Sequence, residues 1–238
     1  MTKRSALVLL LALLLPATLL AGESTRSVTL GETSIELLVL EPEGFDPEVA
    51  HPLLLALPPG GQSMKLVRSA ADSYWTTLAA MRGWVVVSPA APAGRLFVDD
   101  EGAALLPELV ARLGELFEIE GKVHLAGVSN GGKSAFRSAI ENTGLYASLT
   151  VMPGVPPTKG FFDRLSALEG LPVLMYVGEE DTPWVKGSRT TASRLGELGI
   201  DVELVVVPGD RHFLRSFSVS DLYDRLESYR PDPGGSGD

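Results

Sequence analysis

The sequence contains no cysteine among its 238 residues. This absence excludes disulfide bonds, thiolate metal ligands, a cysteine nucleophile and the acylated cysteine of a lipoprotein. Histidine is also scarce, because the whole chain has three, so few side chains can act as a general base near neutral pH. Stability must therefore come from a packed core, and 45% hydrophobic residues in a chain of this length suffice for one domain.

The common cofactor-binding motifs are absent as well. The sequence has no G-x-G-x-x-G dinucleotide motif, no phosphate-binding P-loop and no cluster of cysteine and histidine. We therefore expect neither an organic cofactor nor a metal. The formal net charge of -10 makes nucleic acids and anionic membrane surfaces poor partners.

The first 21 residues differ in character from the rest. Lys3 and Arg4 are followed by an unbroken apolar run from Ala6 to Leu15 and by a short stretch that ends at Ala21. This order is typical of a secretory signal peptide cleaved after Ala21. A membrane anchor is the alternative, but the stretch from Ala6 to Ala21 is interrupted by Pro16 and is shorter than the about 20 residues that a span needs. We predict export to the periplasm or the extracellular space and no stable membrane association after cleavage, which changes the formal charge from -10 to -12.

Short apolar runs alternate with helix-compatible stretches along the remaining chain. Two runs, Arg26–Leu30 and Ser34–Leu40, flank Gly31 and predict an antiparallel pair of strands. Six further runs are rich in Val and Leu and hardly alternate with polar residues, which is typical of strands buried on both faces of a parallel sheet. They are Leu53–Leu57, Trp84–Val87, Val123–Ala126, Leu149–Met152, Val173–Val177 and Leu204–Val207.

Helix start and stop signals lie between these runs. Proline or threonine stands near several starts, and glycine follows several ends. The predicted helices cover Met64–Arg82, Pro107–Phe117, Gly132–Asn142, Thr182 to Gly199, and Ser220–Tyr229. Strands alternating with helices predict an α/β domain over residues 22–230, with a mostly parallel twisted sheet and helices on both faces. Residues 231–238 are rich in Gly, Pro and Ser and predict a flexible tail.

One motif near the middle of the chain points to chemistry. Gly127-Val128-Ser129-Asn130-Gly131-Gly132 stands between a predicted strand and a predicted helix. G-x-S-x-G in this context is typical of a nucleophile elbow, a tight turn that exposes the serine hydroxyl at the carboxyl edge of a sheet. The flanking glycines are expected because a Cβ there would collide with the neighbouring strand and helix.

The chain resembles the α/β-hydrolases, and among them the secreted esterases that carry G-x-S-N-G-G, such as polyhydroxybutyrate depolymerase-like and feruloyl esterase-like proteins. The resemblance covers about residues 52–213. It rests on the elbow, Leu57-Pro58-Pro59-Gly60-Gly61-Gln62, Gly178-Glu179-Glu180-Asp181 and Gly209-Asp210-Arg211-His212. It implies the α/β-hydrolase fold and a triad in the chain order Ser, Asp, His, which Ser129, Asp181 and His212 follow.

His212 is the expected base, because it lies in the loop after the last predicted strand. His51 precedes a strand, on the side of the sheet away from the elbow, and His124 lies inside a strand, where a hydrogen-bonded core residue is the ordinary interpretation. Asp181 stands where the family has its acid. Glu179, Glu180 and Asp210 are the alternative carboxylates, although Asp210 is too close to His212 along the chain for an easy supporting bond.

The oxyanion hole requires backbone N–H donors. One is expected from Asn130, and the second from Gly60 or Gly61, with Gly60 favoured. The family often has His-Gly-Gly-Gly here, whereas this chain has Pro58-Pro59, which have no N–H to donate. A double glycine that only makes a tight turn is the alternative. The Asn130 and Gln62 side chains either orient loops or contact substrate. Five aromatic residues either line a pocket or belong to the core: Trp184, Phe97, Phe161, Phe162 and Phe213.

Together these features predict an exported serine hydrolase that cleaves a small-molecule or polymeric carboxylic ester through an acyl-enzyme intermediate. The segment 153–172 is too short for a lid domain, so we expect an open site. A peptidase or thioesterase with the same triad and a catalytically silent binding protein remain alternatives. The acyl and alcohol specificity and the oligomeric state are not indicated by the sequence.

Overall fold

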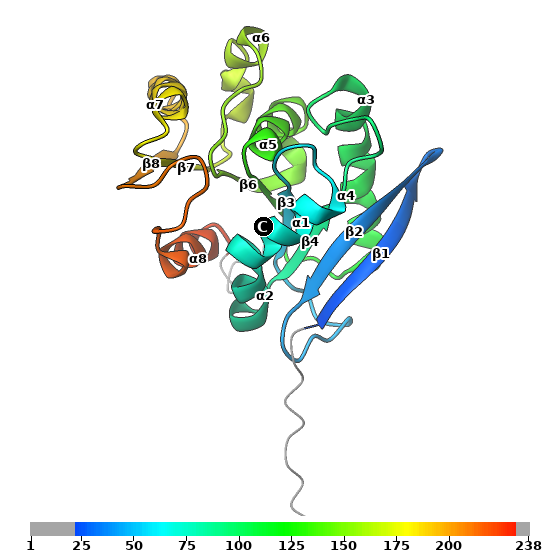
Figure 1. Cartoon of the computed structure of the whole chain (residues 1–238). Helices are drawn as coiled ribbons and strands as arrows, with labels where there is room; N and C mark the ends of the chain where they lie inside the picture. Colours follow the sequence, from blue (N-terminus) through cyan, green and yellow to red (C-terminus); the bar gives the residue numbers. More distant parts are fainter. Residues whose placement is uncertain (1–21, 232–238) are drawn as a thin grey trace, which may run out of the picture.

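The computed structural model describes residues 22–231. The predicted signal peptide, residues 1–21, lies outside the described residues, as does 232–238 of the predicted tail. Eight strands form one sheet in the order β1-β2-β4-β3-β5-β6-β7-β8 (Figure 1). The strands are β1 (Gly22–Leu30), β2 (Thr33–Glu41), β3 (Leu53–Leu57), β4 (Val85–Pro89), β5 (Val123–Gly127), β6 (Tyr146–Val151), β7 (Val173–Gly178) and β8 (Val202–Val207).

The six strands from β3 to β8 are parallel, and the first two are antiparallel additions at one edge. β1 pairs with β2 through a two-residue turn at Gly31, whose φ of 55° suits the first central position of a type II′ turn. The predicted mostly parallel sheet with helices on both faces is confirmed. Strand boundaries differ from the predicted ones by a few residues.

Helices connect the strands and cover both faces of the sheet. They are α1 (Met64–Ala70), α2 (Thr76–Arg82), α3 (Asp100–Ala103), α4 (Leu105–Leu116), α5 (Asn130–Glu141), α6 (Lys159–Phe162), α7 (Thr182–Glu197) and α8 (Val219–Ser228). Buried side chains place α1, α2 and α8 on one face, whereas α4, α5 and α7 pack on the other (Figure 1). In β3, Leu53, Leu55 and Leu57 face one of these two cores, and Leu54 and Ala56 face the other.

Two predicted helices differ in detail from the observed ones. The stretch 64–82 is interrupted by a π-helical turn at Ala71–Trp75, where the Thr76 hydroxyl donates to the Ala71 carbonyl at 3.1 Å. α4 begins two residues before Pro107. A proline fits there because the N–H groups of the first helical turn have no intrahelical partner. The short helices α3 and α6 were not predicted, since four residues carry no periodic pattern.

The parallel direction of β3, β5, β7 and β8 brings their carboxyl ends to the same edge of the sheet. The loops after these four strands carry the candidate residues of the sequence analysis. No helix within residues 22–231 combines the length and the apolar content that a membrane span requires.

Candidate active site

The turn between β5 and α5 holds Ser129 in an unusual backbone conformation. Its φ is 56° and its ψ is -113°, values that L-residues rarely adopt. The Gly131 N–H donates to the Val128 carbonyl at 2.8 Å, which closes a four-residue turn, and the Ser129 N–H donates to the Pro153 carbonyl at 2.9 Å. Such a conformation costs about 1–3 kcal/mol and persists only where its surroundings enforce it.

The glycines around Ser129 are required by close backbone contacts. A Cβ on Gly127 would lie 2.2 Å from the Gly131 carbonyl oxygen, and one on Gly131 would lie 2.1 Å from that of Leu57. A Cβ on Gly132 would lie 2.4 Å from the Pro153 oxygen. Backbone atoms cannot yield as a flexible side chain can, so the steric reason predicted for these glycines holds. The sequence G-x-S-x-G-G therefore seats α5 directly against β3 and the loop after β6.

Three side chains from three loops meet at this edge. The His212 Nε2 lies 2.8 Å from the Ser129 Oγ, and the His212 Nδ1 lies 2.6 Å from the Asp181 Oδ2. Ser129 follows β5, Asp181 precedes α7 just after β7, and His212 follows β8. The His212 side chain is 31% exposed and that of Asp181 is 13% exposed, so solvent reaches the imidazole while the carboxylate is largely covered.

The loops of Asp181 and His212 are also joined through their backbones. The Glu180 N–H donates to the Asp210 carbonyl at 2.9 Å. A Cβ on Gly178 would lie 2.1 Å from the Arg211 carbonyl oxygen, so only glycine lets the two loops approach this closely. The carboxylate and the imidazole are therefore fixed relative to each other by main-chain contacts as well as by their own hydrogen bond.

The alternative carboxylates have other partners. The Glu179 carboxylate accepts from the Gly209 N–H at 3.1 Å, and the Glu180 carboxylate accepts from the Arg211 Nε at 3.0 Å. Asp210 is buried and bonds to backbone N–H groups of its own loop. The geometry therefore leaves Asp181 as the carboxylate that contacts the imidazole.

Asp210 instead shapes the loop that carries His212. Its Oδ2 accepts the N–H of Arg215 at 2.7 Å and that of Ser216 at 2.9 Å. Burial disfavours the charged form, but these hydrogen bonds outweigh it and lower the pKa of Asp210 below its ordinary value.

The other two histidines lie away from Ser129. The His51 Nδ1 lies 3.1 Å from the Gly83 carbonyl oxygen, before β3 begins. His124 is fully buried in β5, with its Nδ1 2.8 Å from the Ser148 Oγ. Burial lowers the pKa of His124 to about 4, and the Arg230 charge adds to this effect. His124 is therefore a neutral core residue, as the sequence predicted.

No protein-family model and no curated protein matches the sequence. Solved structures do match its fold. A ferulic acid esterase superimposes with a TM-score of 0.71 at 15% identity, over 89% of this chain and 98% of that one. A thermostable esterase gives a TM-score of 0.63 at 16% identity, over 88% of this chain and 60% of the other. The chain has the α/β-hydrolase fold.

Peptidases share this fold as well. The dipeptidyl peptidase 4 of Porphyromonas gingivalis matches with a TM-score of 0.65 at 16% identity, over 88% of this chain. This chain spans 35% of the length of that peptidase. At such low identity the likeness establishes the α/β-hydrolase fold, and the chemistry must be argued from the site itself.

The loop after β3 lies beside the elbow, as expected of this fold. The Asn130 side-chain amide donates to the Gly60 carbonyl at 3.0 Å, which ties this loop to the start of α5. Gly60 has a φ of 58°, and Gly61 follows it in the same turn. Within residues 22–231, no hydrogen bond occupies the backbone N–H of Asn130, Gly60 or Gly61. All three donors therefore remain available for a ligand.

Gln62 forms hydrogen bonds with the two prolines of this loop. Its N–H donates to the Pro59 carbonyl at 3.0 Å, and its side-chain amide donates to the Pro58 carbonyl and to the Ser134 hydroxyl, each at 3.2 Å. Its Oε1 accepts the Phe97 N–H at 2.7 Å. Gln62 is fully buried, so of the two interpretations left open by the sequence, the loop-orienting one applies to its side chain.

The five candidate aromatic residues divide into two groups. The Trp184 ring lies 5.2 Å from that of His212, and the Phe213 ring lies 5.3 Å from it on an exposed side chain. Phe97 is fully buried, whereas Phe161 and Phe162 pack against the core and stay half-buried. The sequence analysis missed Lys133, whose Nζ lies over the Trp184 ring at 5.2 Å. Its place one helical turn after Ser129 was the available signal.

A metal site is not apparent beside these residues. In the described part of the chain, no group of three or more His, Asp or Glu side chains is arranged to hold a metal ion. The arrangement offers instead a hydroxyl, an imidazole and a carboxylate in one line, with unoccupied N–H groups nearby.

Proposed function

We propose that this protein is a serine hydrolase that cleaves carboxylic esters through a covalent acyl-enzyme intermediate. The observation that carries the proposal is the continuous line of hydrogen bonds from Asp181 through His212 to Ser129. A serine hydroxyl is a weak nucleophile until a neighbouring imidazole accepts its proton, and a carboxylate fixes the tautomer of that imidazole. The strained turn at Ser129 adds support, because strain of this kind concentrates at functional sites.

In the proposed reaction the Ser129 Oγ attacks the ester carbonyl while the His212 Nε2 takes its proton. Asp181 keeps the Nδ1–H of His212 in place and stabilises the imidazolium. The N–H groups of Asn130 and of Gly60 or Gly61 stabilise the oxyanion of the tetrahedral intermediate. His212 then protonates the leaving alcohol, and a water activated by the same imidazole hydrolyses the acyl-enzyme.

An accessible ester, rather than the interfacial substrate of a lipase, is favoured by the openness of the site. The segment between β6 and β7 contains only α6 and a short 3₁₀ helix at Leu165–Leu168, and the His212 ring remains accessible. We further propose that the hydrolase is exported through its first 21 residues and that it belongs with the esterases that carry G-x-S-N-G-G. Mass spectrometry of protein recovered outside the cytoplasm tests the export, with Gly22 expected as the first residue.

A fluorophosphonate probe tests the nucleophile. We expect stoichiometric labelling of the wild type, loss of labelling in Ser129→Ala and retention in Ser134→Ala. Ser134 is the matched control because its hydroxyl lies one helical turn away and is buried. Labelling of folded Ser129→Ala would contradict the proposed role of Ser129. A folded wild type that never reacts would favour a binding protein.

A panel of 4-nitrophenyl esters of graded acyl length tests the reaction class, with a thioester and a peptide anilide as competitors. The proposal requires a kcat/KM for at least one ester that exceeds those for the thioester and the anilide, and that disappears in Ser129→Ala. Faster turnover of the thioester or the anilide would replace the esterase assignment by a thioesterase or a peptidase.

A further inference from the structure

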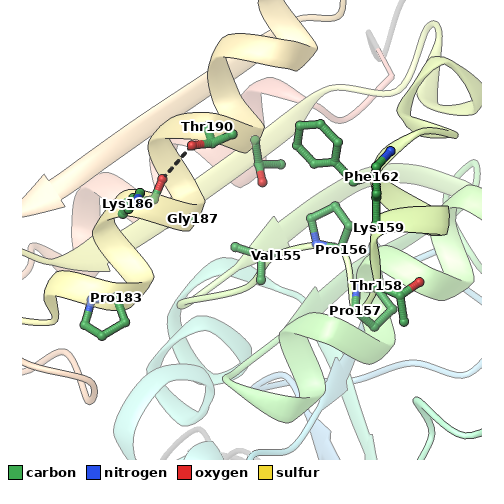
Figure 2. A pocket seen from close by; sticks show the side chains of 11 residues that line it. Val155, Pro156, Pro157, Thr158, Lys159, Phe162, Pro183, Lys186, Gly187 and Thr190 are labelled. Atoms are coloured by element: carbon green, nitrogen blue, oxygen red, sulfur yellow. Dashed lines mark hydrogen bonds between the residues drawn. The ribbon is translucent and has the colours of Figure 1, made fainter.

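An elongated groove leads away from His212 between α6 and α7. Its near part, about 290 Å³, begins at Trp184 and Lys133. Its far part, about 550 Å³, continues between the two helices (Figure 2). Val155, Pro183 and Gly187 line both parts, so the two hollows adjoin, and we call them together the α6–α7 groove.

The groove is connected to the proposed nucleophile through two contacts. The Trp184 ring at its near end lies against the ring of His212, with centroids 5.2 Å apart. The Lys133 N–H donates to the Ser129 carbonyl at 3.1 Å, so the lysine stands one helical turn from the serine. The near part therefore adjoins the triad across the Trp184 ring, and the far part lies beyond it.

The walls of the far part are mainly apolar. Figure 2 shows Val155, Pro156 and Phe162 on the α6 side, facing Pro183 and Gly187 of α7. Apolar walls with a few polar groups at the rim are typical of sites that bind a mostly apolar ligand. Burying such a ligand is favourable because apolar surface is removed from water.

Lysine side chains line this groove in an otherwise acidic protein. Residues 22–231 contain five lysines, and three of them line the groove: Lys133, Lys159 and Lys186. Among residues 22–231, no Asp or Glu lines either part. Lys159 forms an ion pair with Asp163 at 2.6 Å, whereas Lys133 and Lys186 form none with the residues that the structure describes. Two uncompensated ammonium groups therefore flank an apolar hollow.

We propose that the α6–α7 groove binds the non-reacting part of an ester whose apolar body ends in a carboxylate. The apolar body lies against Trp184, Val155 and Phe162, and Lys186 contacts the carboxylate while Lys133 adds positive potential near the triad. Hydrogen bonds between an ammonium and a carboxylate are among the stronger ones in proteins. The proposal deepens the proposed function and rests on it for the reaction, but the binding step can be measured separately.

Gly187 lies where the two parts adjoin. A Cβ on Gly187 would lie 3.2 Å from the Val155 Cγ1, a tighter contact than most Cβ atoms make. A larger side chain at this position of α7 would therefore protrude between the two parts. A Cβ on Gly196, in the same helix, would meet no atom within 4 Å, so Gly196 supplies a matched control.

Two substrates of equal chain length test the charge. The mono-4-nitrophenyl ester of suberic acid carries a terminal carboxylate, and 4-nitrophenyl octanoate lacks it. We expect Lys186→Met to lower the ratio of their kcat/KM values about tenfold, in favour of the neutral ester. Lys122→Met, on the opposite end of β5, should leave the ratio unchanged. An unchanged ratio in Lys186→Met would overturn the proposal.

The same assay tests whether long acyl chains lie along the α6–α7 groove. Gly187→Val should lower kcat/KM for both long esters at least tenfold relative to 4-nitrophenyl acetate, whose acyl group does not reach the groove. Gly196→Val should leave the kcat/KM for the long esters relative to 4-nitrophenyl acetate as in the wild type. Equal effects of the two substitutions would show that the long chains bind elsewhere and would overturn the proposal.

A binding measurement separates this inference from the proposed reaction. The fluorescent probe 8-anilinonaphthalene-1-sulfonate is an aromatic anion, and N-phenyl-1-naphthylamine is its neutral counterpart. In the Ser129→Ala background we expect Lys186→Met to raise the Kd of the anion about tenfold and that of the neutral probe hardly at all. Equal Kd values for the anion in both proteins would overturn the groove assignment. The expected shift in Kd, together with no turnover of any ester by the protein that retains Ser129, would instead overturn the proposed function.

Discussion

Two serine–histidine pairs in this molecule share the same hydrogen-bond length. In the core, the His124 Nδ1 lies 2.8 Å from the Ser148 Oγ, and at the sheet edge the His212 Nε2 lies 2.8 Å from the Ser129 Oγ. The pairs differ in everything around them. His124 is fully buried and, among the described residues, faces no carboxylate at hydrogen-bond distance, whereas His212 is partly exposed and Asp181 holds its second nitrogen.

The backbone of the serine differs as well. Ser148 lies in the regular strand β6, but Ser129 stands in a turn with a positive φ. The comparison teaches that a serine beside a histidine is not in itself a catalytic arrangement. The third group, the partial exposure of the histidine and the positive φ of the serine distinguish the two pairs.

The largest difference is expected when each histidine is removed in turn. His212→Ala should lower kcat for the best ester about 10⁴- to 10⁶-fold, because the serine loses its base. His124→Gln should change kcat less than tenfold in protein that remains folded, because this ring does not contact the site. Steady-state kinetics with circular dichroism as the folding control measures both. Comparable losses of kcat in the two folded variants would contradict a special role for the pair at the sheet edge.

Removing the carboxylate should make the edge pair resemble the core pair. Asp181→Asn is expected to lower kcat about 10⁴-fold, because the amide favours the wrong tautomer of His212. Glu180→Gln, next to it in the chain, is the matched control and should retain activity within a few-fold, since its carboxylate pairs with Arg211. Full activity of Asp181→Asn would mean that another carboxylate supports His212.

The core pair should make the free energy of unfolding depend on pH. Because the pKa of His124 is lowered to about 4 in the fold, against an ordinary value of 6.5, the unfolded chain binds more protons between these values. The contribution of His124 to the free energy of unfolding is therefore fully present above pH 6.5. It falls by about 3 kcal/mol as the pH drops to 4.

Urea unfolding of the wild type and His124→Gln at pH 7.5 and pH 4.5 measures this contribution. The free energy of unfolding of the variant should depend less on pH in this window. Parallel pH profiles for the wild type and His124→Gln would show that folding does not lower the pKa of His124.

The smallest expected effect concerns the strain at Ser129. Ser129→Gly should raise the free energy of unfolding by about 1 kcal/mol, because glycine adopts a positive φ without steric cost and offsets part of this gain by its greater freedom when unfolded. Ser148→Gly, in a regular strand, should instead destabilise the protein. Urea midpoints compare the two. A lower stability of Ser129→Gly would mean that the turn stores no strain.

The sequence predicted the sheet well because its parallel strands are buried on both faces. Leu53–Leu57 and Val173–Val177 are continuous apolar runs for this reason, and the observed strands contain them. The position of Ser129, Asp181 and His212 after such runs predicted that they would meet at one edge. Their side chains lie within hydrogen-bond distance there, while their catalytic roles remain predictions.

Features that depend on long-range contacts could not be predicted. The π-helical turn at Ala71–Trp75 leaves no pattern in the sequence, since it adds one residue to an otherwise helical stretch. The second N–H donor also stayed open between Gly60 and Gly61, because a turn's donors depend on its φ and ψ angles. The approach of Lys133 to Trp184 joins two helices that are about 50 residues apart, and no local periodicity reports it.

The buried Gln62 has a consequence for redesign of the loop after β3. Its side-chain amide and backbone N–H bind the carbonyl groups of both preceding prolines, so Gln62 and the prolines depend on one another. The more common His-Gly pair has the same backbone carbonyls but lacks the fixed φ of proline, so the acceptors of this buried amide would be held less firmly. Residues 58–62 are therefore best exchanged together when this loop is redesigned.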